Sequence, residues 1–196
     1  MLVGKAGVRR RKRMDDGELG DAIAQAREGD EAAFGAVYRD VHPMLLGYLR
    51  SLVGDDADDV ASETWHDIVR DLRGFRGDGL KFRGWAAAIA RHRGLDHIRR
   101  IRVRPRTSTL DEGVTEPSTA QDSEGLALEN LSTERALSLI AELPRDQAEA
   151  VLLRVMLGLN SPTAAQVLGK RPGAVRTAAS RGLKRLSERL NGAEEK

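Results

Sequence analysis

The sequence predicts an all-α protein made of two helical domains joined by a flexible linker. Apolar residues recur at helical spacing both before residue 104 and after residue 131, and no segment alternates as a strand does. Residues 105–130 are polar, acidic and rich in Ser, Thr, Pro and Gly, which is typical of a linker. The chain has 196 residues, 40% of them hydrophobic, so each domain can have a small core.

In the first half we expect helices over residues 18–53, 57–72 and 85–104, with a loop over residues 73–84. The loop is expected because its 12 residues, RGFRGDGLKFRG, include several glycines. The last of these helices should end at Arg104, because Pro105 disfavours helix in the residue before it. In the second half we expect helices over residues 132–143, from Pro144 to Gly158, and from Pro172 onward.

The expected organisation therefore has five parts. These are a basic, disordered leader (1–17), a first domain (18–104), the linker (105–130), a second domain (131–190) and a short tail (191–196). No apolar stretch follows the leader, so it is not a signal peptide, and Met14 is an alternative start of translation.

Composition excludes several classes of protein. Cysteine is absent, which rules out disulfide frameworks and cysteine metal sites. No apolar run reaches the roughly 18 residues that a membrane span needs, so we expect no membrane insertion and a cytoplasmic protein. Net charge is only +2, but basic residues concentrate over residues 99–106 and 170–189, whereas residues 51–69 and 107–134 are acidic. Two basic blocks suggest two nucleic-acid contacts and a separate surface for a protein partner.

Residues 161–180 have the spacing of a helix-turn-helix. Ser161 is expected to cap the first helix with Pro162 at its first position, and Gly169 to supply the positive φ of the turn. Pro172 then opens the second helix, whose apolar face we expect to contain Val175, Ala178, Leu183, Leu186 and Leu190. The opposite face is suited to base edges and phosphates in a major groove. The alternative is an ordinary helical hairpin with a solvated basic face.

Two further features lie in the first half. Asp56, Asp59, Glu63 and Asp67 are spaced to form a carboxylate stripe along one helix, where they repel each other unless a basic partner meets them. Aromatic and cationic residues alternate between Phe75 and Trp85, a pattern suited to stacking on unpaired bases and holding a nucleic-acid backbone. The alternative is that Trp65, Phe82 and Trp85 are core residues.

Taken together, these motifs resemble the extracytoplasmic-function sigma factors of the sigma-seventy family. In the first half the resemblance rests on GDEAAFGAVYRDV, DDADDVASETW and FRGDGLKFRGWAAAIARHRGLDHIRR, which resemble sigma domain two. In the second half it rests on LPRDQAEAVLLRVMLGL and AAQVLGKRPGAVRTAASRGLKRL, which resemble sigma domain four. The sequence departs from the family at Thr163 and Ala164, where glutamate and isoleucine are common, at Arg171, where serine is usual, and at His92, where asparagine is often found.

The resemblance implies a factor that directs core RNA polymerase to promoters and assists melting and initiation. The implied partners are core polymerase (β′ clamp helices and β flap), promoter DNA and an anti-sigma factor. The residues implied to bind the β′ clamp helices are Asp55, Asp56, Asp58, Asp59 and Glu63. Those implied to bind the minus-ten element are Phe75, Arg76, Phe82, Arg83, Trp85, Arg91, His92, Asp96, His97, Arg99 and Arg100. Those implied to bind the minus-thirty-five element are Arg171, Arg176, Thr177, Ser180, Arg181 and Lys184.

Two other functions are considered. A stand-alone helix-turn-helix regulator would explain residues 130–190 but would leave the carboxylate stripe and the aromatic segment without a role. An enzyme with a metal held by His92, Asp96 and His97 is disfavoured, because no further ligand is apparent and neighbouring arginines would repel a cation. We therefore expect no catalytic activity, no metal and no cofactor.

Overall fold

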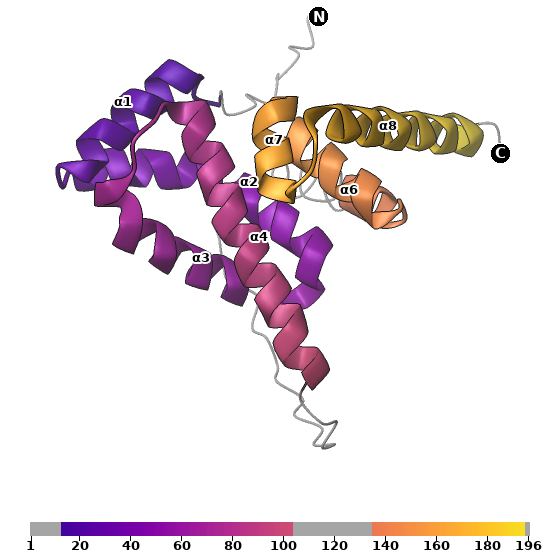
Figure 1. Ribbon diagram of the computed structural model, residues 1–196, viewed down its shortest axis with the longest axis horizontal. Helices are drawn as coiled ribbons and strands as arrows, with labels where there is room; N and C mark the ends of the chain where they lie inside the picture. The colour runs from indigo at the N-terminus through magenta and orange to yellow at the C-terminus, as the bar shows by residue number, and fades with distance from the viewer. Residues whose placement is uncertain (1–12, 104–134, 195–196) are drawn as a thin grey trace, which may run out of the picture.

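The structure, a computed structural model, describes residues 13–103 and 135–194, and these ranges contain helices and turns but no strand. This confirms the prediction of an all-helical protein with two helical domains (Figure 1). The elements of the first domain are α1 (Asp16–Arg27), α2 (Glu31–Val53), η1 (Gly54–Asp56), α3 (Ala57–Asp71), η2 (Leu72–Gly74) and α4 (Gly79–Val103). Those of the second domain are a helical stretch at residues 135–141, α6 (Arg145–Val151), the π-helical η3 (Leu152–Met156), α7 (Ser161–Leu168) and α8 (Pro172–Glu194).

The first domain is a bundle in which α2 and α4 lie at the centre, with α1 and α3 packed beside them (Figure 1). Asp15 begins α1 with a reciprocal capping box to Glu18, and Asp30 caps α2 by accepting a hydrogen bond from Ala33 N. Fully buried Leu45, Tyr48 and other apolar side chains fill the interior. α1 begins at Asp16, so residues 13–17 of the expected leader are placed against this domain, while residues 1–12 lie outside the described part.

The predicted loop over residues 73–84 is wrong for most of its length. α4 begins at Gly79, six residues before Trp85, and only residues 75–78 separate it from η2. Asp78 begins the helix by accepting a hydrogen bond from Lys81 N at 2.8 Å. Gly79 is required by packing rather than by a turn, because a Cβ there would lie 2.5 Å from the carbonyl oxygen of Asp16. Gly79 therefore permits the close approach of α4 to α1.

In the second domain, α8 packs on α6. The contact face consists of Val175 and Ala179, both buried, and Gly182, where a Cβ would lie 2.7 Å from Val151 Cγ2. Of the expected apolar face, Val175 is buried and Ala178 and Leu186 are half-buried against the core, as predicted, whereas Leu183 and Leu190 are exposed. The helix continues to Glu194, beyond the expected start of the tail, and extends away from the first domain (Figure 1).

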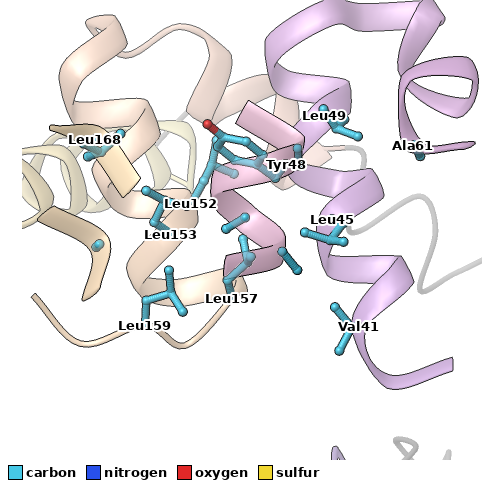
Figure 2. Close-up of a cluster of buried hydrophobic side chains, with 14 of the residues drawn as sticks. Val41, Leu45, Tyr48, Leu49, Ala61, Leu152, Leu153, Leu157, Leu159 and Leu168 are labelled. Carbon is cyan, nitrogen blue, oxygen red and sulfur yellow. The ribbon is translucent and has the colours of Figure 1, made fainter. Parts of the chain in front are cut away.

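The two domains contact each other directly. α7 lies on α4, and η3 lies on α2. Figure 2 shows Tyr48 of α2 beside Leu152 of η3, within one continuous cluster of buried side chains. The expected linker, residues 105–130, lies outside the described residues.

Candidate nucleic-acid and protein interfaces

Much of the carboxylate stripe is paired with basic side chains of α4. Asp56 Oδ2 lies 2.9 Å from His97 Nε2, and Glu63 Oε2 lies 3.6 Å from a guanidinium nitrogen of both Arg93 and Arg100. These side chains are partly exposed, and each pair contributes modestly to stability. The repulsion expected along the stripe is thus relieved within the domain itself, by the neighbouring helix.

Asp67 is the buried member of the stripe. Arg93 Nη2 donates to Asp67 Oδ1 at 2.7 Å, and Arg70 Nη1 lies 2.7 Å from the same oxygen. The hydrogen bond from Arg93 holds the pKa of the Asp67 carboxyl below its ordinary value, against the opposing effect of burial. Asp67 therefore joins α3 to α4 and is unavailable to a partner.

Three other carboxylates at the start of α3 remain exposed. Asp55, Asp58 and Asp59 lie in η1 and the first turn of α3, where the helix dipole favours negative charge. Asp58 lies 3.9 Å from Arg50, and neither Asp55 nor Asp59 makes an ion pair with any residue that the structure describes. This end of α3 is therefore a compact acidic surface open to a basic partner.

The aromatic segment is a three-ring cluster. Ring centroids lie 5.4 Å apart for Phe75 and Phe82, 5.1 Å for Phe75 and Trp85, and 5.6 Å for Phe82 and Trp85. Phe82 is fully buried, whereas Phe75 and Trp85 are half-buried. In this conformation only Phe75 and Trp85 have a surface that a base could contact, and Phe82 supports them from below.

All five expected minus-ten arginines have partners within the chain, and for Arg83 and Arg76 these partners include backbone carbonyls. Arg83 is 4% exposed, and its guanidinium contacts Asp16, the carboxylate of Asp40 and the carbonyl of Met14. Arg76 donates to the carbonyls of Arg73 and Phe75, both at 2.8 Å, and so folds back on its own loop. Arg83 in this arrangement is a structural residue of the first domain.

Five exposed or half-buried positions of α4 form a stripe at helical spacing, which we call the α4 stripe. Its members are Lys81, Trp85, His92, Asp96 and Arg99, which lie within about 60° of one another around the helix. Asp96 lies between its two neighbours, 3.1 Å from His92 and 2.8 Å from Arg99. Lys81 was not among the residues expected from the sequence. It was expected to lie in a loop, whereas α4 begins at Gly79 and places Lys81 on the same helix face as Trp85.

The helix-turn-helix consists of α7, a turn at Gly169 and α8. Gly169 has φ +63°, which confirms the expected left-handed turn. Asn160, rather than Ser161, caps α7, since its side chain accepts from Thr163 N at 2.9 Å, and Pro162 is accordingly the second helical residue. Lys170 Nζ lies 2.7 Å from Asp146 Oδ1, and this hydrogen bond lowers the pKa of Asp146 while tying the turn to α6.

The outward face of α8 is exposed at every position expected to contact the minus-thirty-five element. Val175 and Ala179 point to the core, which directs the intervening residues outward. The exposed side chains are Arg171, Arg176, Thr177, Ser180, Arg181 and Lys184. Lys184 Nζ has a distant acidic neighbour, Glu188, at 3.9 Å. The face therefore offers cations and hydroxyls to a polyanion.

The histidines do not form a metal site in the described ranges. His92 pairs with Asp96 but His97 pairs with Asp56, and no group of three or more potential ligands occurs in this part of the chain. His42 accepts a hydrogen bond from Trp65 Nε1 at 3.1 Å, and burial lowers the pKa of His42.

Within residues 13–103 and 135–194, no helix combines the length and apolar character needed to cross a membrane.

Comparison with known proteins agrees with the architecture. The family model for sigma-70 region 2 matches residues 37–104, and that for sigma-70 region 4 matches residues 133–186. The chain is 34% identical over 177 residues to the sigma factor ShbA of Streptomyces griseus, covering 86% of this chain and 93% of the relative. It is also 34% identical over 184 residues to SigD of Mycobacterium tuberculosis, covering 89% and 85%. The chain therefore belongs to the sigma-70 family, as an extracytoplasmic-function RNA polymerase sigma factor.

Solved structures share the fold. CnrH, solved in complex with the cytosolic domain of CnrY, superposes with a TM-score of 0.59 at 24% identity, covering 89% of this chain and 98% of that one. RpoE of Bartonella quintana, solved with the anti-sigma factor NepR, gives a TM-score of 0.58 at 24% identity, covering 81% and 96%. Because the family models match both halves of the chain, a stand-alone helix-turn-helix regulator is not favoured.

Proposed function

We propose that this sigma factor divides its work among three surfaces. The acidic start of α3 binds core polymerase, the α4 stripe with Phe75 binds the minus-ten element, and the outward face of α8 binds the minus-thirty-five element. The observation that carries the proposal is the separation of charge: exposed carboxylates gather at one end of α3, while exposed cations line α4 and α8. A surface for a basic protein and two surfaces for DNA require that arrangement.

The polymerase contact centres on Asp55, Asp58 and Asp59. Of the five expected residues, Asp56 and Glu63 are already paired with α4, so a partner must compete for them. The basic groups of the β′ clamp helices would meet the three exposed carboxylates without breaking a pair. Such exposed charges steer association and orient the complex more than they add affinity.

The minus-ten contact combines stacking with backbone binding. Trp85, at one end of the α4 stripe, and the neighbouring Phe75 are half-buried, and an unpaired base could stack on the accessible part of either ring. His92 and Arg99 lie farther along the same face, 73% and 70% exposed, where they could bind the phosphates of the same strand. The two rings act once the strands have separated, because duplex DNA does not present base faces.

The minus-thirty-five contact uses α8 as a recognition helix in the major groove. Arg176 and Arg181 can pair with base edges, and Thr177 and Ser180 with bases or phosphates.

We propose that this protein acts with its polymerase in the cytoplasm. We also propose an anti-sigma factor as a regulator, supported by the two solved structures, in which CnrH is in complex with the cytosolic domain of CnrY and RpoE with the anti-sigma factor NepR.

Charge reversal at the start of α3 tests the polymerase contact. Asp55→Lys with Asp59→Lys should weaken binding to core polymerase about tenfold, because attraction becomes repulsion at two exposed positions. The matched control is Asp21→Lys with Glu28→Lys, which makes the same charge change at exposed positions in α1 and at its C-terminal end. Affinity is measured by fluorescence titration with core polymerase, and unfolding curves show that both variants fold. Equal affinities of the two double variants would contradict the proposed surface.

A further inference from the structure

We infer that Arg13 is a latch that holds the two domains together in the free protein. The latch is the contact between the Arg13 guanidinium and the carbonyl oxygens of Met156 and Leu157, in the second domain. Arg13 Nη1 donates to Met156 O at 3.2 Å, and Nη2 donates to Leu157 O at 2.6 Å. These carbonyls lie at the end of η3, where a helix has no internal partner for them and favours a cation.

The residues after Arg13 are fixed to the first domain. Met14 N donates to Asp40 Oδ1 at 2.8 Å, and Met14 O accepts from Arg83 Nη2 at 2.7 Å. Arg83 in turn contacts Asp16 and lies 3.4 Å from Asp40 Oδ2. The backbone that carries Arg13 is therefore anchored on α2 and α4, while its side chain binds the second domain.

The surface closed by the latch is closely packed. A Cβ at Gly84 of α4 would collide with the methyl group of Thr163 in α7, and a Cβ at Gly47 of α2 would collide with Met156. Thr163 is one of the positions at which the sequence departs from its family, and its small side chain permits this approach. Arg91 of α4 lies 3.5 Å from Glu149 of α6 across the same boundary.

The latched arrangement is incompatible with simultaneous binding of both promoter elements. This conclusion rests on the proposed function, in which α4 and α8 bind these elements. The minus-ten and minus-thirty-five elements are about 25 base pairs apart, or about 85 Å of B-form DNA. α4 is only about 38 Å long, and α7 lies directly on it. Both elements can be bound at once only after the domains separate, and residues 104–134 are long enough to span about 100 Å when extended. Release of the latch therefore precedes full promoter engagement.

Energy transfer between two dyes tests the latch without polymerase or DNA. The chain has no cysteine, so Asp21→Cys in α1 and Ser187→Cys in α8, both exposed, give two unique labelling sites. The free protein should show mainly high transfer. Arg13→Ala should raise the low-transfer fraction about tenfold, because two charge-assisted hydrogen bonds are lost. Deletion of residues 1–13 should do the same, since the chain from Met14 keeps its anchor to Asp40 but has no latch.

Two controls separate the latch from a general charge effect. Arg11→Ala removes the same charge from the same basic leader and should leave the transfer unchanged. Gly84→Leu should open the domains by a different route, through the collision with Thr163. Low transfer in the unmodified chain, no change on Arg13→Ala, or an equal change on Arg11→Ala would overturn the inference. Because no measurement involves polymerase, failure of the proposed function would leave these results as they stand.

Discussion

Arg91 in α4 and Glu149 in α6 form an ion pair across the domain boundary, with 3.5 Å between Nη2 and Oε2. Glu149 is 5% exposed, and it lies beside Tyr48, whose pKa is raised by burial and then by the charge of Glu149. Arg91 is one of the residues expected to bind the minus-ten element. A residue assigned to DNA is thus engaged by the other domain of the same chain, which ties the arrangement of the domains to the function of α4.

Replacement of Phe82 should destabilise the first domain rather than affect DNA directly. Phe82 is fully buried beneath Phe75 and Trp85, so Phe82→Ala should lower the free energy of unfolding by about 3–5 kcal/mol. Phe75→Ala, at a half-buried ring of the same cluster, is the matched control and should cost less. Denaturant unfolding measures both, and a larger loss at Phe75 would contradict the assignment of Phe82 to the core.

The contribution of Asp67 to the free energy of unfolding should be lost at acidic pH. The pKa of this carboxyl is lowered in the folded state by its hydrogen bond from Arg93, so the stabilisation is present above the ordinary pKa of about 3.9. It is lost as the pH falls through the lower, folded-state pKa. Asp67→Asn should therefore reduce stability at neutral pH and flatten its decline below about pH 4.

Asp71 provides the comparison for Asp67. Its pKa is also lowered, by a hydrogen bond from Arg70, but its side chain is 51% exposed. Solvent screening should make Asp71→Asn nearly neutral for stability. Urea unfolding at several pH values measures both variants, and equal effects of the two substitutions would count against a buried role for Asp67.

Two glycines of α8 should respond in opposite directions to alanine. A Cβ at Gly182 would lie 2.7 Å from Val151 Cγ2, so Gly182→Ala should cost about 1–3 kcal/mol through overpacking against α6. Nothing lies within 4 Å of a Cβ at Gly173, so Gly173→Ala should stabilise the helix by about 0.5–1 kcal/mol. Thermal unfolding measures both changes. A stabilising Gly182→Ala would contradict the packing of α8 on α6.

The sequence predicted the helices well where caps and turns mark them, as at Asp30, Gly54 and Gly169. It failed at the start of α4, because two of the glycines that suggested a loop serve close packing inside the helix, Gly79 against Asp16 and Gly84 against Thr163. Local patterns report propensity, and tertiary contacts overrode it here.

The sequence predicted which types of residue form the candidate site, but it did not predict which of these side chains are exposed. Arg83 is an arginine in an aromatic and basic segment, yet its partners Asp16 and Asp40 are 67 and 43 residues away in the chain. No local pattern reveals such a pairing. Lys81 was missed for the related reason that its helical register depends on where α4 begins. Only the fold divides the expected residues between core and surface.

The division of promoter contacts between the domains is the central claim. Holoenzyme carrying Arg176→Ala should form the closed promoter complex less tightly, by about 1–3 kcal/mol for a lost base contact. The promoter DNA in the complexes that do form should melt normally. Holoenzyme carrying Trp85→Ala should bind closed promoter nearly as well as the unmodified protein and should fail to open it. Both substitutions are at surface positions outside the fully buried core.

Permanganate reactivity of unpaired thymines, measured beside closed-complex affinity on the same promoter, tests that claim most directly. The account predicts that Trp85→Ala abolishes most of the reactivity with little loss of closed-complex affinity. It predicts that Arg176→Ala lowers that affinity and that reactivity per bound complex is unchanged. Normal melting with Trp85→Ala, or a defect of Arg176→Ala confined to melting, would contradict the assignment of minus-ten binding to α4 and minus-thirty-five binding to α8.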